Sequence, residues 1–179
     1  MLIERILGVL KLDINTFEDI EHDQNATMQA AIVVIAAAVL SGIGSGLEAE
    51  VGFISVFIGV TIWAVIAWFL WSALTYFIGT NLFGGKADMG EMLRVIGFAQ
   101  APQMLNILGF IPILGGIIRF VTGIWALVTA FIAVRQGLDI DNIKTAITVL
   151  IGWLVMFIGS LIVAGLVAGA AVIGGALGG

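Results

Sequence analysis

The residues best suited to chemistry in this sequence are three amides near one arginine. Arg119 stands alone in a long uncharged segment, and Gln100, Gln103 and Asn106 recur ahead of it at three-residue spacing. Guanidinium and carboxamide groups donate several hydrogen bonds and can hold anions, but neither is a nucleophile. These four residues therefore predict a buried polar cluster, and their pattern favours a structural role in which hydrogen bonds hold two helices together. The alternative is a functional pocket for a lipid headgroup, an anion or a small solute.

Pro102 lies inside this group and predicts a helix kink. A proline has no N–H to donate, so it leaves a backbone carbonyl in need of another donor, which is costly away from water. If the flanking helices form a hairpin centred near Ile111, Gln103 lies beside Arg119 and Asn106 lies one turn further out. An arginine in that position supplies donors to the group around the kink.

A second group, Asp88, Glu91 and Arg94, lies at the start of a predicted helix. Asp88 and Glu91 have the spacing of a capping box, and Glu91 can pair with Arg94 along one helix face. An acidic run over residues 18–23 is typical of a solvated turn, with a site for a hard cation or a basic partner as the alternative. Neither group has the pattern of a catalytic triad or of paired catalytic carboxylates.

The composition indicates where these residues lie. The chain has 179 residues, of which 61% are hydrophobic and 11% charged, and its mean hydropathy is +1.18. Soluble domains carry roughly 25% charged residues, so this chain is predicted to be an integral membrane protein. It has no cysteine and one histidine, which predicts no metal site, and its net charge of -5 argues against nucleic acid as a partner. We expect no enzymatic activity and no cofactor.

Long charge-free runs predict an all-α fold with five transmembrane helices in a bundle over residues 25–179. A helix rises about 1.5 Å per residue and needs roughly 20 apolar residues to cross the hydrocarbon core. Pro and Gly residues over 109–112 divide one long run into two. The alternative is four spans with a re-entrant segment over 92–118. The predicted spans are residues 26–47, 52–81, 90–108, 112–134 and 146–170.

Residues 1–24 are predicted to form a cytoplasmic amphipathic segment. Over residues 2–15, the polar positions Glu4, Gly8 and Lys11 recur at helical spacing, while leucines and isoleucines fill the other side. This pattern is typical of a helix that lies in the membrane interface. It is equally typical of a short packed helix with one solvated face.

The basic residues predict the orientation in the membrane. Loops on the side of the N-terminus carry the lysines and arginines, whereas the opposite loops, 47–52 and 109–112, contain Glu48 and Glu50 and no basic residue. The positive-inside rule therefore places the N-terminus in the cytoplasm, and five spans place the C-terminus outside. Arg119 is near enough to this outer side for its long side chain to extend toward Glu48 or Glu50.

Small residues recur at four-residue spacing in two of the predicted spans. Gly42 with Gly46, and Gly165 with Gly169, remove side chains from one helix face and allow backbones to approach closely in lipid. This spacing favours close packing inside the bundle. A homo-oligomer formed through the Gly-rich helix faces is the alternative.

One segment resembles a known family. It reads Tyr76, Gly79, Phe83-Gly84-Gly85, Glu91, Leu93, Val95, Gly97, Ala99 and Pro102, and it is similar to the core of the Yip1 family in its short prokaryotic form. The resemblance implies five helices, a cytoplasmic N-terminus and a location in a prokaryotic cell membrane. Eukaryotic members of that family act in early secretory trafficking and bind Rab-type GTPases through an N-terminal motif that this sequence lacks.

The sequence as a whole predicts a non-enzymatic, Yip1-like integral membrane protein. Its predicted role is that of a trafficking-type adaptor or scaffold that organises the membrane, with membrane lipids and a protein at the cytoplasmic face as partners. The alternative is a small transporter, channel or lipid-binding protein that uses the polar cluster around Arg119.

Overall fold

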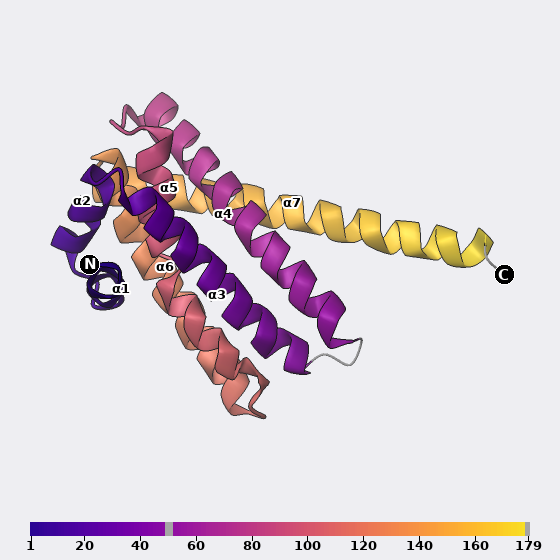
Figure 1. Ribbon diagram of the computed structural model, residues 1–179. Coiled ribbons are helices and arrows are strands. Elements are labelled where there is room, and N and C mark those ends of the chain that lie inside the picture. The colour runs from indigo at the N-terminus through magenta and orange to yellow at the C-terminus, as the bar shows by residue number, and fades with distance from the viewer. Residues whose placement is uncertain (49–51, 178–179) are drawn as a thin grey trace.

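The computed structural model describes residues 1–48 and 52–177, with side chains described as far as Gly159 and at Leu161. Glu50 and the surroundings of Gly165 and Gly169 lie outside the described residues. Every regular element in the described part is a helix (Figure 1). The elements are α1 (Leu2–Leu10), α2 (Ile14–His22), α3 (Ala26–Glu48), α4 (Phe53–Phe83), α5 (Met89–Phe98), the 3-10 helix η1 (Ala101–Phe110), α6 (Leu114–Leu138) and α7 (Asn142–Leu177).

Four helices in the described part of the chain are long and apolar enough to cross a membrane. They are α3, α4, α6 and the segment Asn142–Gly159 of α7, with hydropathy values between 1.7 and 2.4. They coincide with the first, second, fourth and fifth predicted spans. The chain is therefore an all-helical integral membrane protein, as the charge-free runs predict.

The prediction of one continuous helix over residues 90–108 is wrong. The α-helix α5 ends at Phe98, and the chain continues from Ala101 as the 3-10 helix η1, with Pro102 in its first turn. Pro102 cannot donate a backbone hydrogen bond and its ring obstructs the preceding turn, so the α-helix stops before it. The predicted kink at Pro102 is thus a change of helix type.

The α5–η1 segment runs alongside α3 in the same direction. Gly97, near the end of α5, lies against Ala30 in the first part of α3. Further along, the Ser41 hydroxyl donates to the Gln103 carbonyl over 3.1 Å. Beyond that, the backbones approach so closely that a Cβ atom on Gly44 would overlap the carbonyl of Asn106. A glycine is required there because any side chain would separate η1 from α3.

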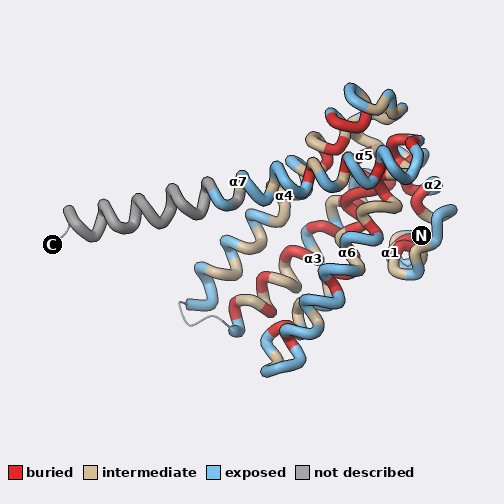
Figure 2. Tube along the Cα trace, turned by 180° about the vertical axis from the view of Figure 1, so that it is seen from behind, coloured by how far each residue is buried: buried red, intermediate tan, exposed pale blue. Residues whose placement is uncertain are grey.

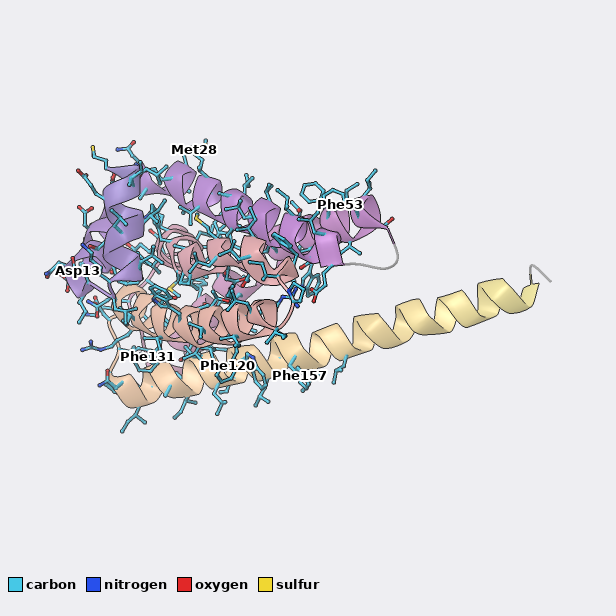
Figure 3. The ribbon with its side chains drawn as sticks, turned by 90° about the horizontal axis from the view of Figure 1, so that it is seen from below. Asp13, Met28, Phe53, Phe120, Phe131 and Phe157 are labelled. Carbon is cyan, nitrogen blue, oxygen red and sulfur yellow. The ribbon has the colours of Figure 1, made fainter. Side chains whose placement is uncertain are left out.

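The tightly packed core lies at one end of the bundle, which we call the packed end. Helices α1, α2 and α5 meet there with the start of α3 and the end of α6, and Phe17, Ile20, Met92 and Leu138 are fully buried among them (Figure 2). Elsewhere the outer faces carry exposed apolar side chains, including Met28 and Phe53 (Figure 3). Such faces are stable where lipid, and not water, surrounds them.

Arg5 fixes α1 to the packed end. Its side chain is only 8% exposed. Nε and Nη2 donate to Asp19 over 3.0 and 2.8 Å, Nη2 also donates to Asp23 over 2.8 Å, and Nη1 donates to Gln29 over 3.1 Å. Hydrogen bonding to Arg5 lowers the pKa of the Asp23 carboxyl. The acidic run thus binds a basic partner from its own chain.

Candidate functional site

The four residues of the predicted polar cluster line one pocket of about 410 Å³. Gln100, Gln103 and Asn106 reach it from the α5–η1 segment and Arg119 reaches it from α6, while Trp71 of α4 and Trp153 of α7 form other walls. We call it the arginine pocket. Among its described lining residues, Arg119 alone is charged, so the pocket offers hydrogen-bond donors and one positive charge.

Arg119 lies at the end of the bundle opposite the packed end, which we call the open end. Its Nη2 forms an ion pair with the carboxylate of Glu48, the last residue of α3, and donates to the Gly109 carbonyl over 3.0 Å. The Arg119 side chain is 40% exposed, and the three amides are half-buried. The sequence predicts that this cluster is buried, but in the structure it is only partly buried.

The register between η1 and α6 differs from the predicted hairpin. Thr122 donates to the Asn106 side chain over 2.7 Å, and Arg119 lies beside Gly109 instead of Gln103. The residue beside Arg119 is thus six positions further along η1 than predicted, about two turns of a 3-10 helix, and two features contribute to this shift. The turn occupies residues 111–113, slightly later than predicted, and a 3-10 helix rises about 2.0 Å per residue compared with 1.5 Å in an α-helix.

Carbonyl groups along the non-α segment receive hydrogen bonds from neighbouring helices. Thr129 of α6 donates to Ala99 over 2.9 Å, and Ser41 of α3 donates to Gln103 over 3.1 Å. Backbone carbonyls at membrane depth need such donors because lipid supplies none. The sequence places Thr122 and Thr129 on one polar face of α6, two turns apart, but does not predict that Thr129 donates to Ala99.

Asp88, Glu91 and Arg94 lie at the packed end and have structural contacts. The capping box is present: Glu91 N–H donates to Asp88 over 2.8 Å, and Asp88 N–H donates to Glu91 over 2.7 Å. The predicted pair between Glu91 and Arg94 is absent among the described ion pairs. Arg94 is 5% exposed and instead donates to the Glu21 carbonyl from Nε and Nη2, over 3.0 and 2.5 Å.

Glu21 is a buried carboxylic acid that the sequence analysis did not single out. It is 6% exposed on α2, outside the candidate spans. Its pKa is raised from 4.5 to about 7, chiefly by burial and also by the charges of Asp139, Glu91 and Glu18, while the charge of His22 acts in the opposite direction. Glu21 therefore gains and loses a proton near neutral pH within the packed end.

The described side chains of the arginine pocket can bind but have no obvious means to catalyse. Arg119 and the amides can hold an anionic or hydrogen-bonding group, while the lining includes no carboxylate, histidine or cysteine. In the described part of the chain, no group of three His, Cys, Asp or Glu residues could hold a metal ion. The arginine pocket therefore offers hydrogen bonds and one positive charge to a bound group.

An all-helical chain with four apolar spans and a polar pocket between them is a multi-pass membrane protein. The chain matches the Yip1 domain over residues 7–165, so it belongs to the Yip1 family. The match begins in α1 and ends in α7, and thus includes both the packed end and the arginine pocket. This result confirms the resemblance found in the segment from Tyr76 to Pro102. No curated protein and no solved structure matches the chain.

Proposed function

We propose that this Yip1-family protein is a non-enzymatic lipid-binding protein that holds an anionic lipid headgroup at Arg119. The observation that carries the proposal is the arginine pocket itself, where one cation and three amides line a space of about 410 Å³. A phosphate would compete with Glu48 for the Arg119 guanidinium, which forms strong hydrogen bonds with either oxyanion. Binding lipid in this way would organise the membrane around the protein.

The depth of Arg119 suits a phospholipid. Arg119 lies near the start of α6, about 7 to 8 Å along the helix from Leu114. Its partner Glu48 ends α3, so the guanidinium lies near the level where headgroups meet the hydrocarbon core. Trp71 and Trp153 line the same pocket and offer apolar surface to an acyl chain.

The proposal includes five crossings of the membrane. Ten residues of α5 and ten of η1 extend about 35 Å at their respective rises, enough for a core roughly 30 Å thick. The segment also runs beside α3 in the same direction. We therefore infer that α5–η1 is the third crossing, despite its break at Pro102.

The distribution of basic residues supports a cytoplasmic packed end. Among the described residues, Arg119 is the one basic residue at the open end, and the other six lie on the side of the packed end. The positive-inside rule then places the N-terminus in the cytoplasm and the C-terminus outside. The basic residues on the side of the packed end are Arg5, Lys11, Lys86, Arg94, Arg135 and Lys144.

Native mass spectrometry tests the lipid-binding proposal. The full chain is released from nanodiscs that contain phosphatidylglycerol and phosphatidylcholine, and retained lipid is identified. We expect one phosphatidylglycerol per chain, lost in Arg119→Leu and partly kept in Arg119→Lys, which preserves the charge but not the planar fork. If Arg119→Leu folds and keeps the lipid, the proposal is wrong. If Arg119→Leu does not fold, Arg119 is required for the fold and the proposal also fails.

A second candidate function is that of an adaptor at the cytoplasmic face. Helix α1 lies across the direction of α3 and α6 in Figures 1 and 3. Arg5 anchors its inner face, while Ile3 and Leu7 on its outer face are 71% and 48% exposed. An exposed apolar helix face either enters a membrane interface or binds a partner.

Paired charge substitutions test this adaptor function. Ile3→Glu with Leu7→Glu leaves the Arg5 contacts in place, and we expect the protein to fold normally. Loss of a stoichiometric protein partner from the purified complex would support the adaptor. Unchanged partner recovery in the double variant would exclude α1 as the docking surface.

A further inference from the structure

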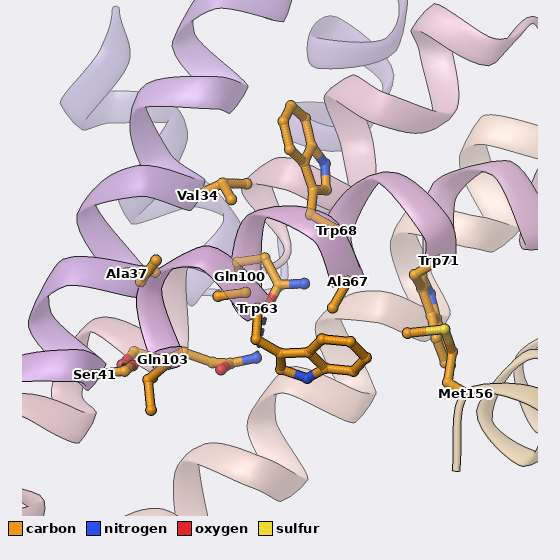
Figure 4. A pocket seen from close by; sticks show the side chains of 13 residues that line it. Val34, Ala37, Ser41, Trp63, Ala67, Trp68, Trp71, Gln100, Gln103 and Met156 are labelled. Carbon is orange, nitrogen blue, oxygen red and sulfur yellow. Dashed lines mark hydrogen bonds between the residues drawn. The ribbon is translucent and has the colours of Figure 1, made fainter. Parts of the chain in front are cut away.

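A second pocket of about 290 Å³ lies on the other side of the Gln100 and Gln103 side chains, between α3, α4 and η1. Trp63, Trp68 and Trp71 of α4 line it together with small residues of α3 and α4 (Figure 4). We call it the tryptophan pocket. Its described lining contains no charged residue, in contrast with the arginine pocket, so it is suited to a neutral ligand.

The polar wall of the tryptophan pocket is a pair of amides. Gln103 Nε2 donates to Gln100 Oε1 over 2.6 Å (Figure 4). Within the described part of the chain, this pair leaves one amide nitrogen, on Gln100, and one amide oxygen, on Gln103, without a hydrogen-bond partner. Reversing both amides still leaves one nitrogen and one oxygen. The wall thus presents one unpaired donor and one unpaired acceptor, whichever way the amides are assigned.

The tryptophan pocket lies in the middle of the bundle. Val34 and Ser41, which line it, are about 12 and 22 Å along α3 from Ala26, and α3 is about 34 Å long. A phosphate or ammonium group would lose most of its hydration at that depth, at a cost of several kcal/mol. This depth therefore favours a ligand with an uncharged polar group over a charged one.

We propose that the tryptophan pocket binds a neutral lipid alcohol, a lipid with an uncharged hydroxyl group such as a diacylglycerol. Its hydroxyl can donate to the Gln103 oxygen, while an ester carbonyl of the same lipid can accept from the Gln100 nitrogen. An ester or quinone carbonyl only accepts and would leave the amide oxygen unpaired. The small side chains Ala37, Ala64 and Ala67 leave space for an acyl chain beside the indole rings.

The pocket also has a route for such a lipid to enter. Trp63 lines the tryptophan pocket and is 43% exposed, so it lies between this pocket and the lipid-facing surface of α4. The neighbouring α4 residues Ile62 and Ile66 are likewise exposed. A lipid can therefore reach the amide pair sideways from the bilayer without passing through water.

Photolabelling in vesicles tests this proposal. The full-length protein is reconstituted in phosphatidylcholine with a diacylglycerol that carries a photoreactive diazirine in one acyl chain, and labelled peptides are mapped. We expect labelling on residues 34–41 and 60–71. Excess unlabelled diacylglycerol should reduce it about tenfold, whereas triacylglycerol, which lacks the hydroxyl, should not. Equal competition by both would show adventitious contact with bulk lipid and overturn the proposal.

Matched variants on α4 sharpen the test. Ala67→Phe fills the pocket, while Ile66→Phe adds an aromatic ring on the exposed face one residue away. We expect labelling to fall about fivefold or more in Ala67→Phe and to stay unchanged in Ile66→Phe. Equal labelling in both variants contradicts the proposal. Should Ala67→Phe not fold, Gln100→Leu removes the amide donor at similar volume and must show the same loss.

Arg119→Leu separates this inference from the proposed phospholipid site. Arg119 lines the arginine pocket but not the tryptophan pocket, so its replacement should leave diacylglycerol labelling unchanged. Loss of labelling in Arg119→Leu, with the protein folded, would mean that the two pockets form one site and would overturn the inference of a separate one.

Discussion

Arg5 of α1 and Arg119 of α6 lie near opposite ends of α3, and they differ in burial and in the number of their hydrogen-bond partners. Arg5 is 8% exposed and donates to Asp19, Asp23 and Gln29. Arg119 is 40% exposed and has one carboxylate, one carbonyl and a pocket beside it. A buried guanidinium with several acceptors stabilises the helices around it, and we call the helices joined by Arg5 the frame. A half-exposed guanidinium with one ion pair can exchange its partner. We therefore assign a structural role to Arg5 and propose a binding role for Arg119.

The same contrast extends to the surroundings of each arginine. Around Arg5, α1 and α2 form a buried core with α5 and α6. Around Arg119, the 3-10 helix η1 is bordered by two pockets that share Gln100, Gln103 and Trp71. We therefore expect changes at the packed end to alter stability first, and changes at the open end to alter binding first.

The largest expected effect is at Gly44, where α3 and η1 touch. Gly44→Leu should destabilise the protein by about 3 kcal/mol, because its side chain would overlap the Asn106 backbone. Gly59→Leu is the matched control, since nothing lies within 4 Å of a Cβ atom there. Thermal unfolding in detergent measures both, and similar melting temperatures for the two variants would contradict the close approach of α3 and η1.

The next effect concerns the frame at Arg5. Arg5→Met keeps the length of the side chain but leaves Asp19 and Asp23 without their cation. We expect a loss of about 2 to 3 kcal/mol, less than for a fully buried pair because Asp19 is 64% exposed. Lys11→Met, at an exposed position, should change stability by less than about 0.5 kcal/mol. A loss as small in Arg5→Met would remove the structural role assigned to this arginine.

Stability of the packed end should depend on pH through Glu21. Its pKa is about 7 in the folded protein and 4.5 in the unfolded chain, so the folded state holds a proton that the unfolded state releases. Stability is therefore greatest at low pH and falls as the pH rises from about 4.5 to about 7, with a loss of about 2 kcal/mol expected between pH 5 and 8. Glu21→Gln should abolish most of this dependence in unfolding measured from pH 5 to 8.

His22 acts in the same direction, since its hydrogen bond to the Glu18 carbonyl raises its pKa. An unchanged pH dependence in Glu21→Gln would therefore assign the effect to His22 and contradict the role given to Glu21.

The smallest expected change in stability is at Arg119. Arg119→Leu removes an exposed ion pair and one hydrogen bond to Gly109, and we expect a cost below about 1 kcal/mol. Denaturant unfolding of the variant measures it. A cost equal to that of Arg5→Met would mean that both arginines belong to the frame.

Much of the fold follows from local sequence. The charge-free runs predict α3, α4, α6 and α7, because length and hydropathy alone decide whether a helix can span a membrane. The grouping of Gln100, Gln103, Asn106 and Arg119 in one pocket also follows from helical spacing and a hairpin. Local periodicity suffices where the relevant residues lie on adjacent helices.

The remaining features depend on contacts between distant residues. Arg5 lies in a helix of mixed polarity, and its burial requires Asp19 and Asp23 to fold back upon it. The length of η1 depends on donors from Ser41 and Thr129, which stabilise a non-α backbone. Pro102 marks where the α-helix is interrupted, but no pattern within residues 90–110 shows that the chain continues as a ten-residue 3-10 helix.

One experiment tests the division between frame and binding site most directly. Wild type, Arg5→Met and Arg119→Leu are each reconstituted with phosphatidylglycerol and phosphatidylcholine, and melting temperature and retained lipid are measured on the same samples. We predict that Arg5→Met melts earlier but keeps its phosphatidylglycerol below that temperature, while Arg119→Leu melts near the wild-type temperature and loses the lipid. If melting temperature and retained lipid fall together in both variants, the two arginines have one role and the account is contradicted.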